Sequence, residues 1–285
     1  KVDTGMHRVG AEPDDAEALA AAIVAAPGLV LQGLWTHLAV ADDPAQDDFT
    51  ALQLARFDAL RARLAAAGVR PPLVHAANSA GAMAHPASRY DMVRCGIALY
   101  GYTPSRSLRA AAGGLRPVLS LRARVAYVRR FAVADRVSYG RRYEVAAGSV
   151  VATVPLGYAD GVARRLAEVG GEVLIGGRRR PMAGTVTMDQ LLVDCGPEAA
   201  VAVGDEVVLI GGQGDQQITA TEWADRLDTI SYEVLCGISA RVPRVWSTST
   251  EARSEVGRFS PPPPTSSGLA GDPAGLGRAG PTLLA

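Results

Sequence analysis

The segment Asn78-Ser79-Ala80-Gly81 has residue types that could hold an anion. It follows a short apolar run and is predicted to begin a helix, where backbone N–H groups are free to donate. The Ser79 hydroxyl adds a further donor, so phosphate is a ligand that this segment could bind. An ordinary helix cap has the same sequence, and both interpretations stay open for this segment by itself.

Arg94 and His37 lie near the ends of apolar stretches. A guanidinium near the end of a buried strand is costly unless it is paired, so Arg94 predicts a partner in any case. Gly96 and Ile97 follow it, and the missing side chain at Gly96 would let the backbone approach an anion. His37 closes the run 29–38, where a histidine is either a ligand-facing group or a hydrogen-bonded core residue.

Two other sites combine a charge or a phenol with a turn. Lys1 and Arg8 flank a turn-like segment, and Lys1 is the only lysine among 29 basic residues. A strand end followed by a loop with surface charges would explain this pattern as well. Tyr139 lies in a loop flanked by serine and glycine, where tyrosines mostly serve packing. A free phenol has a pKa of about 10, so catalysis by Tyr139 at neutral pH would require neighbouring cations.

The composition excludes several classes of function. A formal net charge of zero argues against an electrostatic nucleic-acid binder. The chain has no apolar run of roughly 18 residues and no signal-like beginning, so we expect a cytoplasmic protein without a membrane span. The cysteines are odd in number and too widely spaced for a zinc site, which predicts buried, reduced thiols. They are Cys95, Cys195 and Cys236.

The first part of the chain alternates predicted helices and strands. Helices are expected over 13–26 and 46–67, and strands over 29–39, 73–77 and 92–99. The run 29–39 has few polar alternations, as in a strand covered on both faces. This alternation is the signature of parallel βα units.

After residues 113–114 the period changes to two, beginning at 121–127, which predicts a β domain over 116–246. Thr219 and Glu222 form a capping box for one helix within it. A Ser-, Thr- and Pro-rich segment over 247–285 is expected to be a disordered tail. Further short strands are predicted over 149–156, 172–175, 182–187, 191–194 and 206–210.

Several of these segments, in this order, resemble motifs of bacterial alanine racemases, and the resemblance extends from residue 1 to about 245. The motifs are Lys1–Gly10, Trp35–Ala39, His75–Ala80, Arg94–Gly101, Ser138–Gly140, Gly157–Gly161, Met188–Gln190 and Ile230–Val234. The resemblance implies a (β/α)8 barrel that binds pyridoxal 5′-phosphate, followed by a mainly β domain. A closed barrel needs about 250 residues, so residues 1–115 would form only its second half.

The resemblance assigns a cofactor role to several residues. Arg94 would donate to the pyridine nitrogen and leave it unprotonated, because a guanidinium stays charged. His37 would lie against the cofactor ring. The phosphate would be held by Ser79, Gly96, Ile97 and Tyr232, and Asn78 would also bind the cofactor.

The resemblance also implies a two-base racemisation of L-alanine and D-alanine. Tyr139 would remove the Cα proton of L-alanine, and the cofactor-binding lysine would serve the D-enantiomer. Lys1 would be carbamylated and would hold Arg8, which would contact the cofactor or the substrate carboxylate. Tyr158, Met188 and Asp189 would lie on the substrate side. Tyr139 would reach the site of a second subunit, so the family implies a homodimer with composite sites.

The Schiff-base lysine of the family lies upstream of Lys1, so we expect an N-terminally truncated racemase that is inactive by itself. The D-alanine that the complete enzyme makes would serve peptidoglycan synthesis. A related broad-specificity or serine racemase stays open. So does a non-catalytic remnant that still dimerises or binds the cofactor phosphate.

Overall fold

The computed structural model describes residues 1–110 and 113–246. Two compact units divide at Val242, and of the second only 243–246 are described, without helix or strand. The predicted tail, 247–285, lies outside the described residues. No helix of the described residues is long and apolar enough to cross a membrane.

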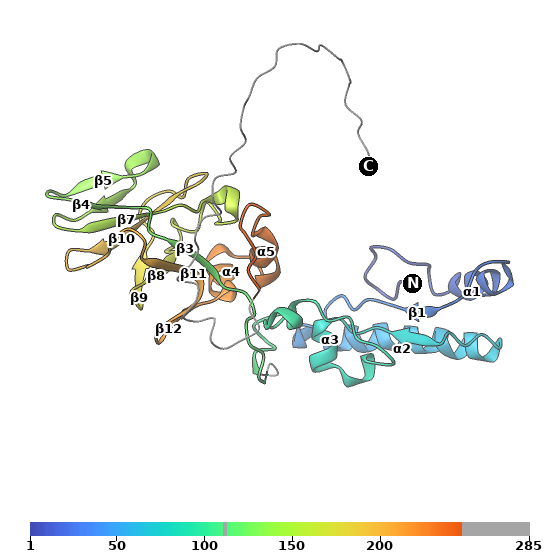
Figure 1. Ribbon diagram of the computed structural model, residues 1–285. Coiled ribbons are helices and arrows are strands. Elements are labelled where there is room, and N and C mark those ends of the chain that lie inside the picture. The colour runs from blue at the N-terminus through green and yellow to red at the C-terminus, as the bar shows by residue number, and fades with distance from the viewer. Residues whose placement is uncertain (111–112, 247–285) are drawn as a thin grey trace, which may run out of the picture. The chain divides into compact units, whose positions relative to one another are not determined.

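An α/β part comes first (Figure 1). Its two strands, β1 (Gly33–Trp35) and β2 (Leu73–His75), pair in parallel, as the βα pattern predicts. Between them α2 (Asp47–Ala66) ends before Gly68, whose φ of 77° suits a helix C-terminus. The other elements are α1 (Ala16–Ala25), η1 (Pro44–Gln46), α3 (Ser79–Ala84), η2 (Pro86–Ser88) and η3 (Ile97–Tyr100). These βα units do not close a barrel.

Helix α2 covers one face of the β1–β2 sheet. Its buried side chains Phe57, Leu60 and Leu64 pack with Leu34 of β1 and Val74 of β2. Ala16 and Ala20 of α1 complete this core. Phe57, Leu60 and Leu64 lie at helical spacing on the buried face, whereas Leu52, an apolar residue of the same helix, is exposed.

Two strand predictions in the α/β part are wrong. The run 29–39 forms a strand only over 33–35, and Leu29 and Val30 are exposed, because α1 ends in a turn that includes Leu29. The predicted strand 92–99 is a single bridge from Arg94 to Asn78 followed by η3. The reason is a contact with α3: the Ser79 hydroxyl accepts from the backbone N–H groups of Gly96 and Ala98, in place of a neighbouring strand.

The β-rich part contains antiparallel sheets. One has the order β10-β7-β4; another has the order β12-β11-β8-β9, with β3 pairing β11. A third sheet is the β5–β6 hairpin. The strands of the β-rich part are β3 (Leu121–Arg124), β4 (Tyr127–Arg130), β5 (Asp135–Val137), β6 (Tyr143–Val145), β7 (Val150–Val154), β8 (Glu172–Ile175), β9 (Arg178–Pro181), β10 (Leu191–Gly196), β11 (Glu206–Gln213) and β12 (Gln216–Ile218).

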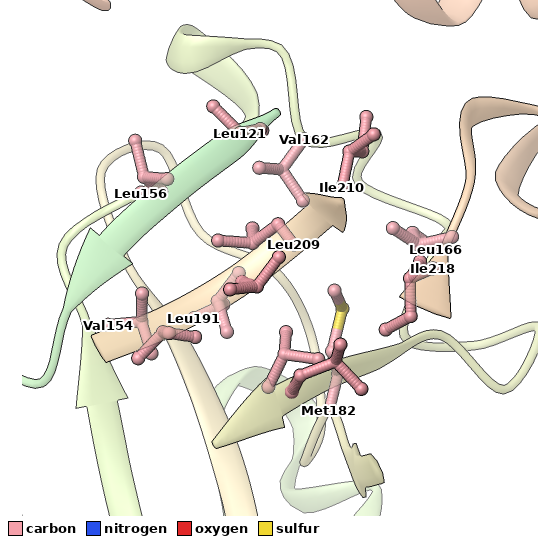
Figure 2. Close-up of a cluster of buried hydrophobic side chains, with 14 of the residues drawn as sticks. Leu121, Val154, Leu156, Val162, Leu166, Met182, Leu191, Leu209, Ile210 and Ile218 are labelled. Atoms are coloured by element: carbon pink, nitrogen blue, oxygen red, sulfur yellow. The ribbon is translucent and has the colours of Figure 1, made fainter. Parts of the chain in front are cut away.

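The core of this part lies between the sheets and the helices α4 (Ala220–Leu227) and α5 (Ser231–Gly237). Figure 2 shows Leu209 and Ile210 of β11 among Leu121, Leu191 and other apolar side chains. Short η5 (Tyr139–Arg141) and η6 (Tyr158–Asp160) complete the elements. The predicted N-cap is confirmed, since the Thr219 side chain accepts from the Glu222 N–H and α4 follows. The other half of the capping box is not formed among the described residues, because the Glu222 carboxylate accepts from Arg179 and Arg226.

Other predictions in this part need correction. The strand expected over 182–187 lies instead at 178–181, where Arg178 is exposed and Arg179 and Arg180 are half-buried. Of the expected residues, only Met182 forms a bridge, to Val193. Helix α5 and the short strands β5, β6 and β12 were not predicted. The cysteines are free, but only Cys195 is buried. Cys236 is exposed because α5 buries the face that carries Ser231 and Val234.

Candidate active site

The carboxyl ends of β1 and β2 meet at one edge of the sheet, and Arg94 lies across them. Its Nη2 donates to the Thr36 carbonyl oxygen at 2.8 Å and to the Ala76 carbonyl oxygen at 2.9 Å. Nη1 lies 2.5 Å from His75 Nδ1, and Nη2 lies 3.3 Å from His37 Nδ1. The predicted partner of Arg94 is therefore a set of carbonyl and imidazole acceptors, without a carboxylate.

Both imidazoles accept from a permanent cation, which fixes their protonation. Burial, and then the charge of Arg94, lower the pKa of His75. The pKa of His37 is lowered by burial, then by Arg94, Arg8 and Lys1. Each ring is therefore neutral at pH 7, with Nδ1 as the acceptor and the proton on Nε2. Arg8, an exposed residue, thus acts on His37 through its charge.

The Trp35 indole packs against Arg94 and His75. The guanidinium carbon lies 5.0 Å from the ring centroid, and His75 stacks on Trp35 at 5.6 Å and 13°. Lys1 Nζ lies 5.3 Å from the same ring. Among the described residues this ammonium is buried and has no hydrogen-bond partner. A buried cation without an acceptor is costly. The site therefore fits a ligand that supplies an acceptor, or a carbamate on Lys1, which would replace the positive charge by a negative one.

The segment that is predicted to hold an anion begins the helix α3, as the sequence predicts. Asn78 caps α3, since its Oδ1 accepts from the Gly81 N–H at 2.9 Å. Ser79 is buried, and its Oγ accepts from the Gly96 N–H at 3.0 Å. A Cβ added at Gly96 would meet no protein atom within 4 Å, and its φ of −106° lies outside the left-handed region. Protein packing therefore does not require glycine there, whereas a ligand close to the backbone would.

Buried polar residues fasten the Lys1–Arg8 turn to this site. Asp3 Oδ1 accepts from the N–H groups of Gly5, Met6 and His7, and these bonds hold the pKa of Asp3 low in spite of its burial. Gln53, fully buried on α2, donates to Thr4 Oγ1 and to the His37 carbonyl oxygen. The turn and the end of β1 are thus held by one side chain.

Tyr139 occupies a strained turn in the β-rich part. Ser138, Gly140 and Arg141 have φ values of 63°, 74° and 50°. The turn is held by Thr185, whose Oγ1 donates to the Tyr139 carbonyl oxygen at 3.2 Å, while Ser138 Oγ donates to the Thr185 carbonyl oxygen at 2.8 Å. Strain of this kind persists only where the surroundings enforce it, and it is concentrated at functional sites. The tyrosine side chain is exposed, with 72% of the residue accessible.

Tyr158 and Met188 are brought together by a close backbone approach. The Tyr158 N–H donates to the Thr187 carbonyl oxygen and the Ala159 N–H to the Met188 carbonyl oxygen, both at 3.0 Å. A Cβ at Gly157 would lie 2.2 Å from the Thr187 oxygen and 2.3 Å from the Met188 oxygen. Only glycine allows these two segments to pack at this distance.

Four of the predicted residues of the β-rich part border one hollow. It has a volume of about 500 Å³ and is bordered by Tyr139, Tyr158, Met188 and Asp189. A second hollow of about 380 Å³ adjoins it at Tyr139 and Gln190. Arg164 also lines the larger hollow. This cation was not identified from the sequence, because it lies six residues beyond Tyr158 in a segment without regular structure.

The predicted residues thus fall into two groups. The Arg94 group holds Lys1, His37, Asn78, Ser79 and Gly96, and the Tyr139 group holds Tyr158, Met188 and Asp189. No hydrogen bond, ion pair or ring contact within 1–110 and 113–246 joins the two groups. The side chain of Ile97 is buried in the core of the β-rich part, and Tyr232 lies near enough to Asp42 that this carboxylate, after burial, raises its pKa.

His75 is the functional residue that sequence reasoning missed in the Arg94 group. The signal was present, since His75 ends β2 three residues before Asn78, inside a motif identified for other residues. Gln53 gave no such signal, because a glutamine within an amphipathic helix is usually solvated, and only tertiary packing buries it.

Comparison with known proteins matches both parts of the chain. The alanine racemase N-terminal domain matches residues 1–104, and the alanine racemase C-terminal domain matches residues 118–246. The alanine racemase of Symbiobacterium thermophilum is 49% identical over 250 residues, which are 88% of this chain and 66% of that protein. The alanine racemase of Cutibacterium acnes is 42% identical over 245 residues, with 64% of its length covered.

Solved structures agree with these matches. The alanine racemase from D-cycloserine-producing Streptomyces lavendulae has a TM-score of 0.80 at 39% identity, over 88% of this chain and 66% of that one. The alanine racemase from Bacillus anthracis with bound L-Ala-P has a TM-score of 0.79 at 39% identity, over 86% of this chain and 63% of that one. The chain therefore spans slightly less than two thirds of these relatives. Since both domains match in their order along the chain, it belongs to the alanine racemase family.

Proposed function

We propose that this chain is the larger part of an alanine racemase, which interconverts L-alanine and D-alanine with pyridoxal phosphate and supplies D-alanine for peptidoglycan. The observation that carries this proposal is the set of neutral imidazoles and carbonyl groups around Arg94, beside the Ser79–Gly96 cradle. Such a site fits a planar ring that bears a phosphate. The family relationship supports the same cofactor and substrate.

Pyridoxal phosphate, when bound, withdraws electrons from an attached amino acid and makes its Cα proton acidic. Ser79, the N-terminus of α3, the backbone at Gly96 and Ile97, and Tyr232 would hold its phosphate. His37 would lie against the ring. Arg94 would donate to the pyridine nitrogen, and its own acceptors keep the guanidinium fixed and charged.

Tyr139 would take the proton from the Cα of L-alanine at its phenolic oxygen. The strained turn holds this side chain at the edge of the hollow that Arg164 also lines. Arg8 would bind the substrate carboxylate, while Tyr158, Met188 and Asp189 would border the substrate.

A homodimer would join the two groups of residues. Tyr139 is exposed on a hollow that contains no residue of the Arg94 group. A second copy that places its Arg94 group against this hollow would complete the site. Each dimer would then contain two composite sites, related by its symmetry.

The 285 residues contain one lysine, Lys1, whose ammonium is buried against Trp35. We infer that Lys1 is carbamylated, and that the Schiff-base lysine is supplied by a segment preceding Lys1. The 285 residues alone would then bind the cofactor without racemising alanine.

The direct test is a fusion enzyme in which the N-terminal segment of the Symbiobacterium thermophilum alanine racemase precedes Lys1. With pyridoxal phosphate it should racemise alanine faster than serine, as measured by chiral chromatography. The Tyr139→Phe fusion should lose about 100-fold or more in kcat from L-alanine, because a positioned base contributes about that factor.

Tyr127→Phe is the matched control, since Tyr127 is an exposed tyrosine of the same β-rich part. It should leave the rate unchanged. A fusion enzyme that folds and binds pyridoxal phosphate but prefers serine would support the broader racemase. One that racemises neither amino acid would contradict the proposal.

A further inference from the structure

The segments that carry Tyr158 and Met188 share a cation outside the hollow that they border. Arg241 Nη2 lies 2.6 Å from Asp189 Oδ1, and Arg241 Nε lies 3.4 Å from Asp160 Oδ1. Asp160 follows Tyr158 by two residues, and Asp189 directly follows Met188. Arg241 therefore connects the two segments through their acidic side chains.

The two carboxylates differ in their surroundings. The Asp160 side chain is only 9% exposed, and its Oδ2 accepts from the Gly157 N–H at 2.9 Å. The Asp189 side chain is 56% exposed. Two carboxylates directed at one guanidinium repel each other when the guanidinium is removed. Since Asp160 is fixed by its burial, the repulsion would displace the loop that carries Asp189.

The position of Arg241 is itself fixed. The Ser239 N–H donates to the Asp160 carbonyl oxygen at 3.1 Å, and the Arg241 N–H donates to Ser239 Oγ at 3.3 Å. A Cβ at Gly161 would lie 2.4 Å from the Gly237 carbonyl oxygen, so the chain after α5 packs directly on the turn that carries Tyr158. The Arg241 guanidinium is therefore carried by a segment whose backbone already contacts this turn.

Arg241 also determines which charge remains available in the hollow. Asp189 and Arg164 both line it. Asp189 is paired with Arg241, whereas Arg164 forms no ion pair within the described part of the chain. Without Arg241, Asp189 would be free to neutralise Arg164.

We propose that Arg241 is a positioning residue that holds Tyr158 and Met188 at the wall of the hollow by neutralising Asp160 and Asp189. A second effect is that the Arg164 charge stays unpaired. This inference rests on the proposed function only where it gives the hollow a catalytic use. The positions of Tyr158 and Met188 at the wall of the hollow are a property of the chain alone.

The test is methyl NMR of the full chain labelled with 13C-methyl methionine, in which Met188→Leu assigns the Met188 signal among five methionines. Arg241→Gln should shift the Met188 methyl signal. It should also speed hydrogen exchange at the Tyr158 and Ala159 amides about fivefold, the size expected for loss of a partly exposed ion pair.

Arg136→Gln is the matched control, because Arg136 is an arginine of equal side-chain exposure, 55% against 54%, that pairs with Glu144 in another hairpin. It should leave the Met188 signal in place. Arg241→Lys should restore part of the wild-type signal. Asp189→Asn combined with Arg241→Gln should restore most of it, since the carboxylate repulsion is then gone.

The proposal is overturned if Arg241→Gln moves the Met188 signal no more than Arg136→Gln does. It is also overturned if the added Asp189→Asn leaves the displacement unchanged, because lost packing alone would then explain it. The measurement needs no catalysis, so absence of racemase activity would count against the proposed function and not against this role of Arg241.

Discussion

Arg94 is the residue on which the α/β half of the site depends. Its donors engage the ends of both strands, so one side chain fixes the separation of the Thr36 and Ala76 carbonyl groups. The same guanidinium requires His37 and His75 to be neutral, because each offers a ring nitrogen as an acceptor. A change in the charge of either imidazole would therefore disturb the whole group.

A pH dependence follows for the two histidines. Burial and Arg94 lower their pKa below the usual value of 6.5, so the folded chain binds fewer protons than the unfolded one. Their contribution to stability is present above pH 6.5 and is lost as the pH falls below it. In an NMR titration both rings should stay neutral below pH 6.5. In the His75→Gln variant, the free energy of unfolding should fall less steeply as the pH is lowered below 6.5. Normal titration of both rings would show that Arg94 has other acceptors.

Features that depend on neighbours in the sequence could be predicted, whereas contacts between distant segments could not. Asn78 and Thr219 were correctly placed as caps because capping depends on neighbours a few residues away. The failed strand at 92–99 depends on Ser79, and the meeting of Tyr158 with Met188 depends on a backbone approach across thirty positions. Periodicity contains no information on such contacts.

Gly157→Ala should be among the most destabilising substitutions in the β-rich part. The added methyl would lie 2.2 Å from a backbone oxygen, so the two segments must separate. We expect the free energy of unfolding in urea to fall by about 2–4 kcal/mol. Gly237→Ala is the control, since a Cβ there meets nothing within 4 Å. Equal effects of the two variants would show that the approach is not required.

A four-residue ion network joins β8 and β9 to α4. Arg179 and Arg226 each contact Glu172 and Glu222 at 2.7–3.2 Å, and these side chains are 26–30% exposed. Hydrogen bonds from Arg179 are the largest cause that lowers the pKa of Glu222. The network should therefore stabilise the packing of α4 on the sheet.

The sign of its pH dependence follows from the depressed pKa. Glu222 contributes stability above its unfolded pKa, and this contribution is lost as the pH falls through the folded value. Glu222→Gln should lower the free energy of unfolding by about 2 kcal/mol at pH 7 and by less near pH 3. Glu144→Gln, which removes an exposed ion pair, should have almost no effect at either pH. A loss that does not depend on pH would rule out this explanation.

At the scale of the whole molecule, the predicted site residues lie in two groups, one in the α/β part and one in the β-rich part. No hydrogen bond, ion pair or ring contact among the described residues joins the two groups. In the proposed enzyme the Arg94 group would supply the cradle and the wall that bind the cofactor. The Tyr139 group would supply an exposed phenol beside Arg164, which forms no ion pair among the described residues. In the proposed enzyme neither group would be a catalytic site by itself. The proposed homodimer explains both, because each copy would supply what the other lacks.

Mixing two inactive variants of the fusion enzyme tests this composite site most directly. Tyr139→Phe and Arg94→Ala are each expected to leave little activity in their own homodimer. After subunit exchange about half of the dimers are mixed, and one of the two sites in each mixed dimer combines the intact Arg94 of one copy with the intact Tyr139 of the other. The account predicts recovery of about a quarter of the unaltered activity. No recovery, with mixed dimers confirmed by native mass spectrometry, would show that Arg94 and Tyr139 of the same chain serve one site, and would contradict it.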